Sequence, residues 1–218
     1  MIKIKAIFYD LDNTIYPQVS DVEKRIEYCI KTFALPNAFD VKRVWLEAWL
    51  ENGPLKHDLV EEIINIFSLK LNKTDLLSAY RACKTSISLE KDTRDFLSRM
   101  KMAGIKQFLI TNGHPKTQLN KIHSLDIEGL FDEIVIATGE YAKPSGYWFK
   151  KMLEKYNLNP EECLSVGDWY AVDGKASLSI GIPFFYMKGG PVREDVPGGI
   201  RSLTRLNDIE EYLDYAYK

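Results

Sequence analysis

The segment IKAIFYDLDNT, residues 4–14, decides the fold. Residues 4–9 form a short apolar run that is rich in β-formers, and the run stops at a polar cluster that begins with Asp10. This cluster contains a second carboxylate, Asp12, followed by Asn13 and Thr14. The pattern predicts a buried strand over 4–9 that ends in a polar, potentially reactive loop.

Downstream of this loop, the apolar residues follow a helical period. Val22, Ile26 and Cys29 fall on one helical face, and Trp45 and Trp49 share another, so residues 18–88 are predicted to be all-helical. Aromatic residues at helical spacing favour packing inside such a unit, so we expect the two tryptophans to belong to its core rather than to stack on a nucleobase.

After residue 88, strands alternate with helices. Strands are predicted over 105–110, 134–137, 163–166 and 182–186, with helices between them and a last helical segment over 206–217. This alternation predicts an α/β fold: a Rossmann-like parallel sheet sandwiched by helices, with an all-helical insertion after the first strand. The expected domains are an α/β core, residues 1–17 and 89–218, and a helical domain, residues 18–88.

Composition excludes several classes of protein. The chain has 218 residues and a formal net charge of −2, which argues against a nucleic-acid partner. We find no signal peptide and no apolar run long enough to span a membrane, and therefore expect a cytoplasmic protein with no membrane partner. Three distant cysteines predict neither a disulfide framework nor a zinc site.

Polar side chains follow four of the predicted strands, in loops that meet at one edge of a parallel sheet. These candidate site residues are Asp10 and Asp12 after the first strand, Thr111 and Asn112 after the second, Lys143 after the third, and Asp168 with Asp173 after the fourth.

Chemistry suggests how these groups would act together. Neighbouring carboxylates raise one another's pKa unless a cation intervenes, and Mg²⁺ is the hard cation that favours carboxylates, water and phosphate. Lys143 adds a fixed positive charge, and the Thr111 hydroxyl is a suitable donor to a phosphoryl oxygen. An aspartate can attack phosphorus, while a second aspartate protonates the leaving alcohol and later activates water.

These residues resemble the four motifs of the haloacid dehalogenase superfamily, in family order and over essentially the whole chain. The first is Asp10-Leu11-Asp12-Asn13-Thr14, the second is Thr111 after Phe108-Leu109-Ile110, the third is Lys143-Pro144, and the fourth is Gly167-Asp168-Trp169-Tyr170-Ala171-Val172-Asp173. The helical insertion is similar to the family's helical cap, which closes over the site and selects the substrate.

The resemblance implies a role for each position. Asp10 is expected to be the nucleophile and a Mg²⁺ ligand, and Asp12 the general acid/base with its backbone carbonyl on the metal. Asp168 would be the other metal ligand, with Asp173 behind it or orienting Lys143. Thr111, Asn112 and Lys143 are expected to bind the substrate phosphate. The implied activity is Mg²⁺-dependent hydrolysis of a small phosphomonoester through an aspartyl-phosphate.

Other activities of the same site are open at this point. Dehalogenases of the superfamily usually lack the second carboxylate, so Asp12 favours phosphate esters, whereas phosphomutases share both aspartates. A phospho-acceptor switch uses similar groups but has a shorter chain without the insertion. The sequence from Asp10 to Pro17, together with Thr111-Asn112-Gly113, resembles the nucleotidase and pyridoxal-phosphatase-like branches of the superfamily. The expected partner is a small phosphorylated metabolite, with nucleotides and sugar phosphates as the candidates, and the protein is expected to be a monomer or homodimer.

Overall fold

The computed structural model describes residues 4–53 and 58–217. Its strands form one parallel sheet in the order β3-β2-β1-β4-β5-β6. The strands are β1 (Ala6–Tyr9), β2 (Lys106–Asn112), β3 (Glu133–Ala137), β4 (Cys163–Gly167), β5 (Phe184–Met187) and β6 (Arg201–Leu203). The α-helices are α1 (Val19–Thr32), α2 (Ala38–Asn52), α3 (Leu59–Ile66), α4 (Lys73–Ala82), α5 (Lys91–Met102), α6 (Pro115–Leu125), α7 (Tyr147–Tyr156), α8 (Lys175–Leu178) and α9 (Asp208–Tyr217).

β1 occupies the middle of the sheet, and its side chains alternate between two hydrophobic cores. Ile7 and Tyr9 pack into the core beneath α5, α6 and α9, whereas Ala6 and Phe8 pack into the core beneath α7 and α8. All four residues are buried, as expected for a parallel strand that is covered on both faces. The chain order reverses at β1, with β2 on one side and β4 on the other, which is where ligands bind in such sheets.

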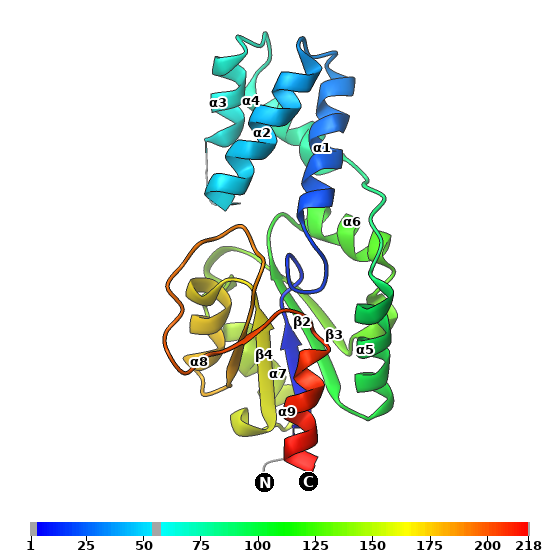
Figure 1. Ribbon diagram of the computed structural model, residues 1–218, viewed down its shortest axis with the longest axis vertical. Helices are drawn as coiled ribbons and strands as arrows, with labels where there is room; N and C mark the ends of the chain where they lie inside the picture. Colours follow the sequence, from blue (N-terminus) through cyan, green and yellow to red (C-terminus); the bar gives the residue numbers. More distant parts are fainter. Residues whose placement is uncertain (1–3, 54–57, 218) are drawn as a thin grey trace.

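The helical insertion consists of α1–α4 and stands beyond one end of the sheet (Figure 1). It has its own hydrophobic core, which includes Val22, Ile26 and Cys29 of α1 together with Trp45 and Trp49 of α2. Both tryptophans are buried, and Trp45 stacks on Tyr80 of α4 at 6.0 Å between ring centroids. The predicted packing of these tryptophans is therefore confirmed, as are the α/β fold and its helical insertion.

Two strand predictions require correction. The second strand was expected to stop at Ile110, but β2 continues through Thr111 and Asn112, which pair with Ile136 and Ala137 of β3. The sixth strand, β6, was not predicted. It has three residues, and two of them, Arg201 and Ser202, are exposed, so it lacks the apolar run by which a buried strand is found.

No helix in the described part of the chain is long and apolar enough to cross a membrane. Cys29, Cys83 and Cys163 are free thiols and all are buried, in agreement with the expectation that no disulfide framework exists.

Candidate active site

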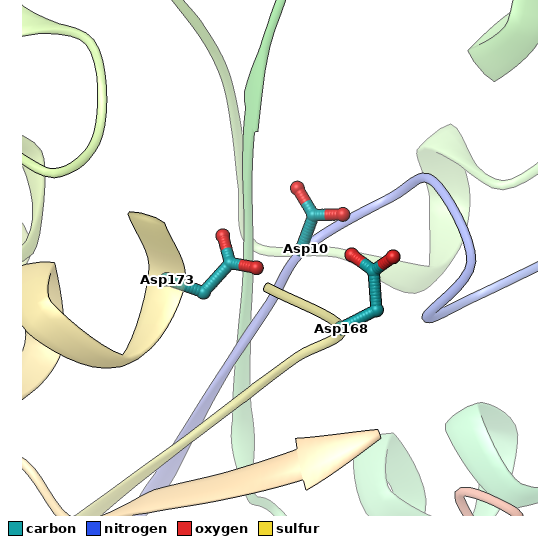
Figure 2. Close-up of side chains that lie close together, drawn as sticks. All are labelled: Asp10, Asp168 and Asp173. Atoms are coloured by element: carbon teal, nitrogen blue, oxygen red, sulfur yellow. The ribbon is translucent and has the colours of Figure 1, made fainter. Parts of the chain in front are cut away.

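The carboxyl ends of β1 and β4 bring three predicted carboxylates together. Asp10 directly follows β1, and its backbone N–H donates to the Val166 carbonyl of β4 at 3.0 Å. Asp168 directly follows β4, and Asp173 lies in the π-helical turn Tyr170–Gly174 that comes next. One oxygen from each of the three side chains lies within 4.8 Å of the others, and Figure 2 shows the carboxylates turned toward one another.

Two glycines leave the space that this acidic cluster occupies. A Cβ at Gly167 would lie 2.5 Å from the Asp173 carboxylate, and a Cβ at Gly190 would collide with Asp168 Oδ2. Gly190 lies in the loop after β5. Its close approach to Asp168 shows that the backbone there is part of the wall of the site.

Lys143 supplies the cation of the cluster. Its Nζ lies 2.6 Å from Asp10 Oδ1 and 2.7 Å from Asp173 Oδ1, and it donates to the Ile110 carbonyl at 2.7 Å. The side chain is only 3% exposed. Asp173 thus contacts Lys143, and its carboxylate also belongs to the group of three whose oxygens could hold a cation.

Asn112 fixes the backbone of Lys143. Its side-chain amide donates to the Lys143 carbonyl at 2.8 Å, and its side-chain oxygen accepts from the Lys143 N–H at 2.9 Å. Both polar atoms of the Asn112 side chain therefore hold the lysine in place. The sequence expectation put Asn112 on the substrate phosphate, whereas this geometry directs it to the residue that carries the charge.

Burial makes two carboxyl groups of the acidic cluster, Asp10 and Asp168, hard to ionise. Loss of water around Asp10 raises its pKa to about 7, against the lowering effect of Lys143 and with a further increase from Asp173 and Asp12. Burial together with Asp10 and Asp173 raises the pKa of Asp168 to about 9. Three buried carboxylates beside one ammonium require more positive charge, and their oxygens are the ligands that Mg²⁺ prefers. The residues present therefore fit a divalent hard cation.

Asp12 lies apart from this cluster. It is bound by Lys121 at 2.7 and 2.8 Å, by the Tyr16 hydroxyl at 2.7 Å and by the Gln118 amide at 3.0 Å. Burial alone would raise the pKa of Asp12. The Lys121 ammonium and these hydrogen bonds outweigh burial and lower that pKa below its ordinary value. Gln118 also donates to Thr111 Oγ1 at 2.7 Å and thereby orients that hydroxyl beside Asp12.

Sequence reasoning missed Gln118 and Lys121. Both lie on the buried stripe of α6, together with Ile122 and Leu125. A lysine and a glutamine on the apolar face of a helix need buried partners, because an unpaired charge there is costly. These polar residues on an apolar face were the available signal, and they lie in the helix predicted between the strands 105–110 and 134–137.

A cavity of about 620 Å³ lies over these groups. Its floor includes the site residues of the sheet, and its opposite wall comes from the helical insertion, with Trp45, Trp49, Tyr80 and Arg81. His114 and Trp169 line it as well, while Tyr170 packs against Phe184 at 6.3 Å between ring centroids. A small molecule in this cavity would contact the acidic cluster at one end and the insertion at the other.

The chain is similar in sequence to several phosphatases. It is 28% identical to a glyceraldehyde 3-phosphate phosphatase of Pyrococcus furiosus, over 99% of this chain and 89% of that protein. It is 24% identical to a phosphoglycolate phosphatase of Aliivibrio fischeri, over 89% of this chain and 90% of that protein.

Solved structures share the fold. The HAD-hydrolase YfnB of Bacillus subtilis, in a magnesium-bound crystal form, superimposes with a TM-score of 0.79 at 17% identity, over 97% of this chain and 99% of that one. A family model described as haloacid dehalogenase-like hydrolase matches residues 4–181, which include the three carboxylates of the acidic cluster, Lys143 and Asp12. The chain belongs to the haloacid dehalogenase-like hydrolases.

Proposed function

We propose that the protein is a Mg²⁺-dependent phosphatase that hydrolyses a small phosphomonoester through an aspartyl-phosphate on Asp10. The observation that carries this proposal is the contact of Lys143 with Asp10 at the floor of the cavity, with Asp12 on the same loop. A carboxylate and a fixed cation at one point suit attack on a phosphoryl group whose oxygens need positive charge. The names of the sequence relatives support the same reaction class.

Asp10 and Asp168 would hold the metal ion, with the Asp12 backbone carbonyl as a further ligand and Asp173 close behind. When bound, Mg²⁺ supplies positive charge to the carboxylates and to the phosphoryl oxygens of the substrate. The mutual distances of the Asp10, Asp168 and Asp173 oxygens and the raised pKa values of Asp10 and Asp168 support this site. Asp173 remains bound to Lys143, which it orients.

In the first step, a carboxylate oxygen of Asp10 forms a bond to phosphorus as the bond to the ester oxygen breaks. Asp12, which is ionised beside Lys121 in the resting site, takes up a proton as the monoanionic phosphomonoester binds and then gives it to that leaving oxygen, which becomes an alcohol. Lys143 and the Thr111 hydroxyl stabilise the phosphoryl oxygens, while Asn112 keeps Lys143 in position. In the second step, Asp12 takes a proton from water, the water oxygen attacks phosphorus, and Asp10 is released with inorganic phosphate.

The helical insertion would select the substrate. Its residues form the wall of the cavity opposite the carboxylates, so groups remote from the phosphate must contact them. We propose that the chain has two domains, with residues 1–17 and 89–218 as the α/β core and residues 18–88 as the helical domain. Ile87 is an exception, because its side chain packs in the hydrophobic core beneath α5, α6 and α9.

The test is hydrolysis by purified protein with Mg²⁺ of glyceraldehyde 3-phosphate, phosphoglycolate, a nucleoside monophosphate, pyridoxal phosphate and p-nitrophenyl phosphate. We expect release of inorganic phosphate from at least one metabolite, and a phosphoenzyme after rapid acid quench. Asp10→Asn is expected to abolish both, whereas Asp126→Asn, at an exposed turn, serves as the matched control.

Other results would identify the alternatives. Halide release from a haloacid without metal would indicate a dehalogenase. Transfer of phosphate between two sites of a sugar phosphate without release would indicate a mutase. A long-lived phosphoenzyme without turnover would indicate a phospho-acceptor switch, and each of these outcomes contradicts the proposal.

A further inference from the structure

A largely buried group of four charged side chains and one threonine connects the Asp12 loop to the helical insertion. We refer to Asp12, Asp21, Arg25, Thr85 and Lys121 as the stem cluster. Lys121 contacts both oxygens of Asp12 and lies 3.9 Å from Asp21 Oδ2. The Lys121 and Asp21 side chains are 3% and 1% exposed, and Arg25 is fully buried.

Asp21 joins the two chain segments that connect the helical insertion to the sheet. It lies in the first turn of α1, just after the chain has left the sheet. It accepts from Arg25 Nε at 2.7 Å and from Thr85 Oγ1 at 2.5 Å, and Thr85 belongs to the segment that returns from α4 to α5. Arg25 also donates to the carbonyls of Tyr80 and Cys83 at the end of α4.

Lys121 stands on the sheet side of this junction. It comes from α6, which Figure 1 shows beneath the lower end of α1 and beside the sheet. The ammonium is the part of the stem cluster that touches both the Asp12 loop and the insertion. The Asp12 carboxylate is therefore connected through Lys121 and Asp21 to both chain segments that join the helical insertion to the sheet domain.

Because these contacts are largely buried, breaking one of them costs more free energy than breaking an ion pair at the surface. An ion pair at the surface adds little, whereas removal of one partner from a buried group leaves an unpaired charge and forces the others to move. Without Lys121, the partly buried Asp12 and the buried Asp21 would have Arg25 as the remaining cation of the stem cluster, and Arg25 contacts Asp21 and the end of α4. Asp12 would lose its bidentate partner and its link to the insertion.

We propose that Lys121 is a positioning residue, which holds Asp12 in place for proton transfer and ties that position to the stem of the helical insertion through Asp21. The inference rests on the proposed function, because it requires Asp12 to be the general acid/base. Lys121 is not required to touch the substrate or the phosphoryl group. Its contribution is expressed in the steps in which Asp12 gives or takes a proton.

Leaving groups of different basicity separate this role from a structural one. An alkyl ester such as glyceraldehyde 3-phosphate needs a proton on its leaving oxygen, whereas p-nitrophenolate leaves without one. Lys121→Met should therefore slow the alkyl ester in the first step. With p-nitrophenyl phosphate, the first step should stay fast and the hydrolysis of the phosphoenzyme should slow, because water then needs Asp12 as a base.

The experiment compares wild type, Lys121→Met, Lys121→Arg and the matched control Lys116→Met, an exposed lysine of the same helix. For Lys121→Met, we expect kcat for the alkyl ester to fall about 100-fold with little change in KM, a scale typical of lost acid–base catalysis. A burst of p-nitrophenolate equal to the enzyme concentration should persist. Lys121→Arg should recover part of kcat, and Lys116→Met should behave as wild type.

A second comparison uses an enzyme that lacks the acid/base. In Asp12→Asn, the additional Lys121→Met change should cost less than twofold in kcat, because residues that act through one another are not additive. An equal loss in both backgrounds overturns the inference, and so does a wild-type kcat in Lys121→Met. If wild type itself forms no phosphoenzyme, the proposed function fails instead.

Asp21→Asn tests the link to the stem if Lys121→Met does not fold. The asparagine keeps the size of the side chain and its bond to Thr85, but removes the negative charge that faces Lys121 and Arg25. We expect kcat for the alkyl ester to fall about tenfold, the lower part of the range for a displaced acid–base group, with the burst retained. An unchanged kcat, or a loss of thermal stability alone, contradicts the inference.

Discussion

Lys143 Nζ lies 2.6 Å from Asp10 Oδ1, in the interior of the protein and across 133 residues of sequence. This contact places a permanent cation against the carboxylate that we propose as nucleophile. Because burial would otherwise keep the Asp10 carboxyl protonated, the ammonium both favours its ionised form and prepares a place for the phosphoryl oxygens.

Replacement of Lys143 by methionine should therefore impair catalysis. We expect kcat/KM to fall by about 10²–10³, the effect typical of losing one electrostatic contact to a developing oxyanion. Steady-state kinetics with the preferred metabolite measure this. Lys150→Met, at an exposed position of α7, is the control, and a Lys143→Met enzyme within twofold of wild type would refute the assignment.

The stability of the metal-free protein should decrease as the pH rises. The pKa values of Asp10 and Asp168 are raised from 3.8 to about 7 and about 9 in the folded state. Between these limits, the folded state keeps protons that the unfolded state has released, so the free energy of unfolding falls by up to ~1.4 kcal/mol per pH unit for each group. The loss begins near pH 4 and is complete above the folded pKa values.

Urea unfolding over this pH range, in EDTA and in Mg²⁺, measures the effect. Bound Mg²⁺ compensates the carboxylates, so the decrease should be smaller in its presence and the metal should bind more tightly at higher pH. Asp168→Asn should make the curve in EDTA shallower. A metal-free stability that increases from pH 5 to pH 8 would be inconsistent with the buried acidic cluster.

Arg81 should discriminate among substrates. It is an exposed cation in the last turn of α4 and lines the cavity from the side of the helical insertion. A substrate with a second negative charge, such as phosphoglycolate, can pair with it, whereas glyceraldehyde 3-phosphate offers no such group. Arg81→Gln is expected to raise KM about tenfold for phosphoglycolate only, since one ion pair is worth about 1.4 kcal/mol when partly shielded from water.

Lys84→Gln controls for the loss of a nearby positive charge, because Lys84 is exposed and does not line the cavity. Equal changes in KM for the two substrates would show that Arg81 attracts the common phosphate rather than a second group.

The sheet domain should fold without the helical insertion. Its hydrophobic cores draw on residues up to Tyr16 and from Ile87 onward, whereas the core of the insertion lies between Val22 and Leu76. Replacing residues 18–86 by a short Gly/Ser linker should leave an α/β circular dichroism spectrum with one cooperative thermal transition. Turnover should be lost because the stem cluster and the cavity wall are missing; an unfolded product would contradict the domain division.

The sequence predicted the sheet and its reactive edge because both depend on local order. An apolar run followed at once by Asp10 or Asp168 marks the end of a buried strand, whatever the rest of the chain does. The same logic missed β6, whose Arg201 and Ser202 face solvent. Its pairing with β5 supplies the structure that its own side chains do not specify.

The stem cluster was beyond local prediction for another reason. Asp21, Arg25 and Lys121 are charged types that are usually exposed. Asp21 and Arg25 pair with each other one turn apart on α1, whereas Lys121 is neutralised by Asp12 and Asp21 from a distant part of the chain. Their positions on otherwise apolar stripes of α1 and α6 are visible in the sequence. The identity of the partners is not, because it depends on how two helices from different parts of the chain meet.

The position of Asp21 on the inserted helix bears on protein engineering. A chimera that received the helices of another family member would change the wall of the cavity and leave the four strand ends intact. It would also exchange the residue that faces Lys121 across the junction. To transfer substrate specificity, the residue at the position of Asp21 in the new insertion would have to be compatible with Lys121 of the sheet domain. Either an acid is kept at the position of Asp21, or both residues are replaced together by those of the donor.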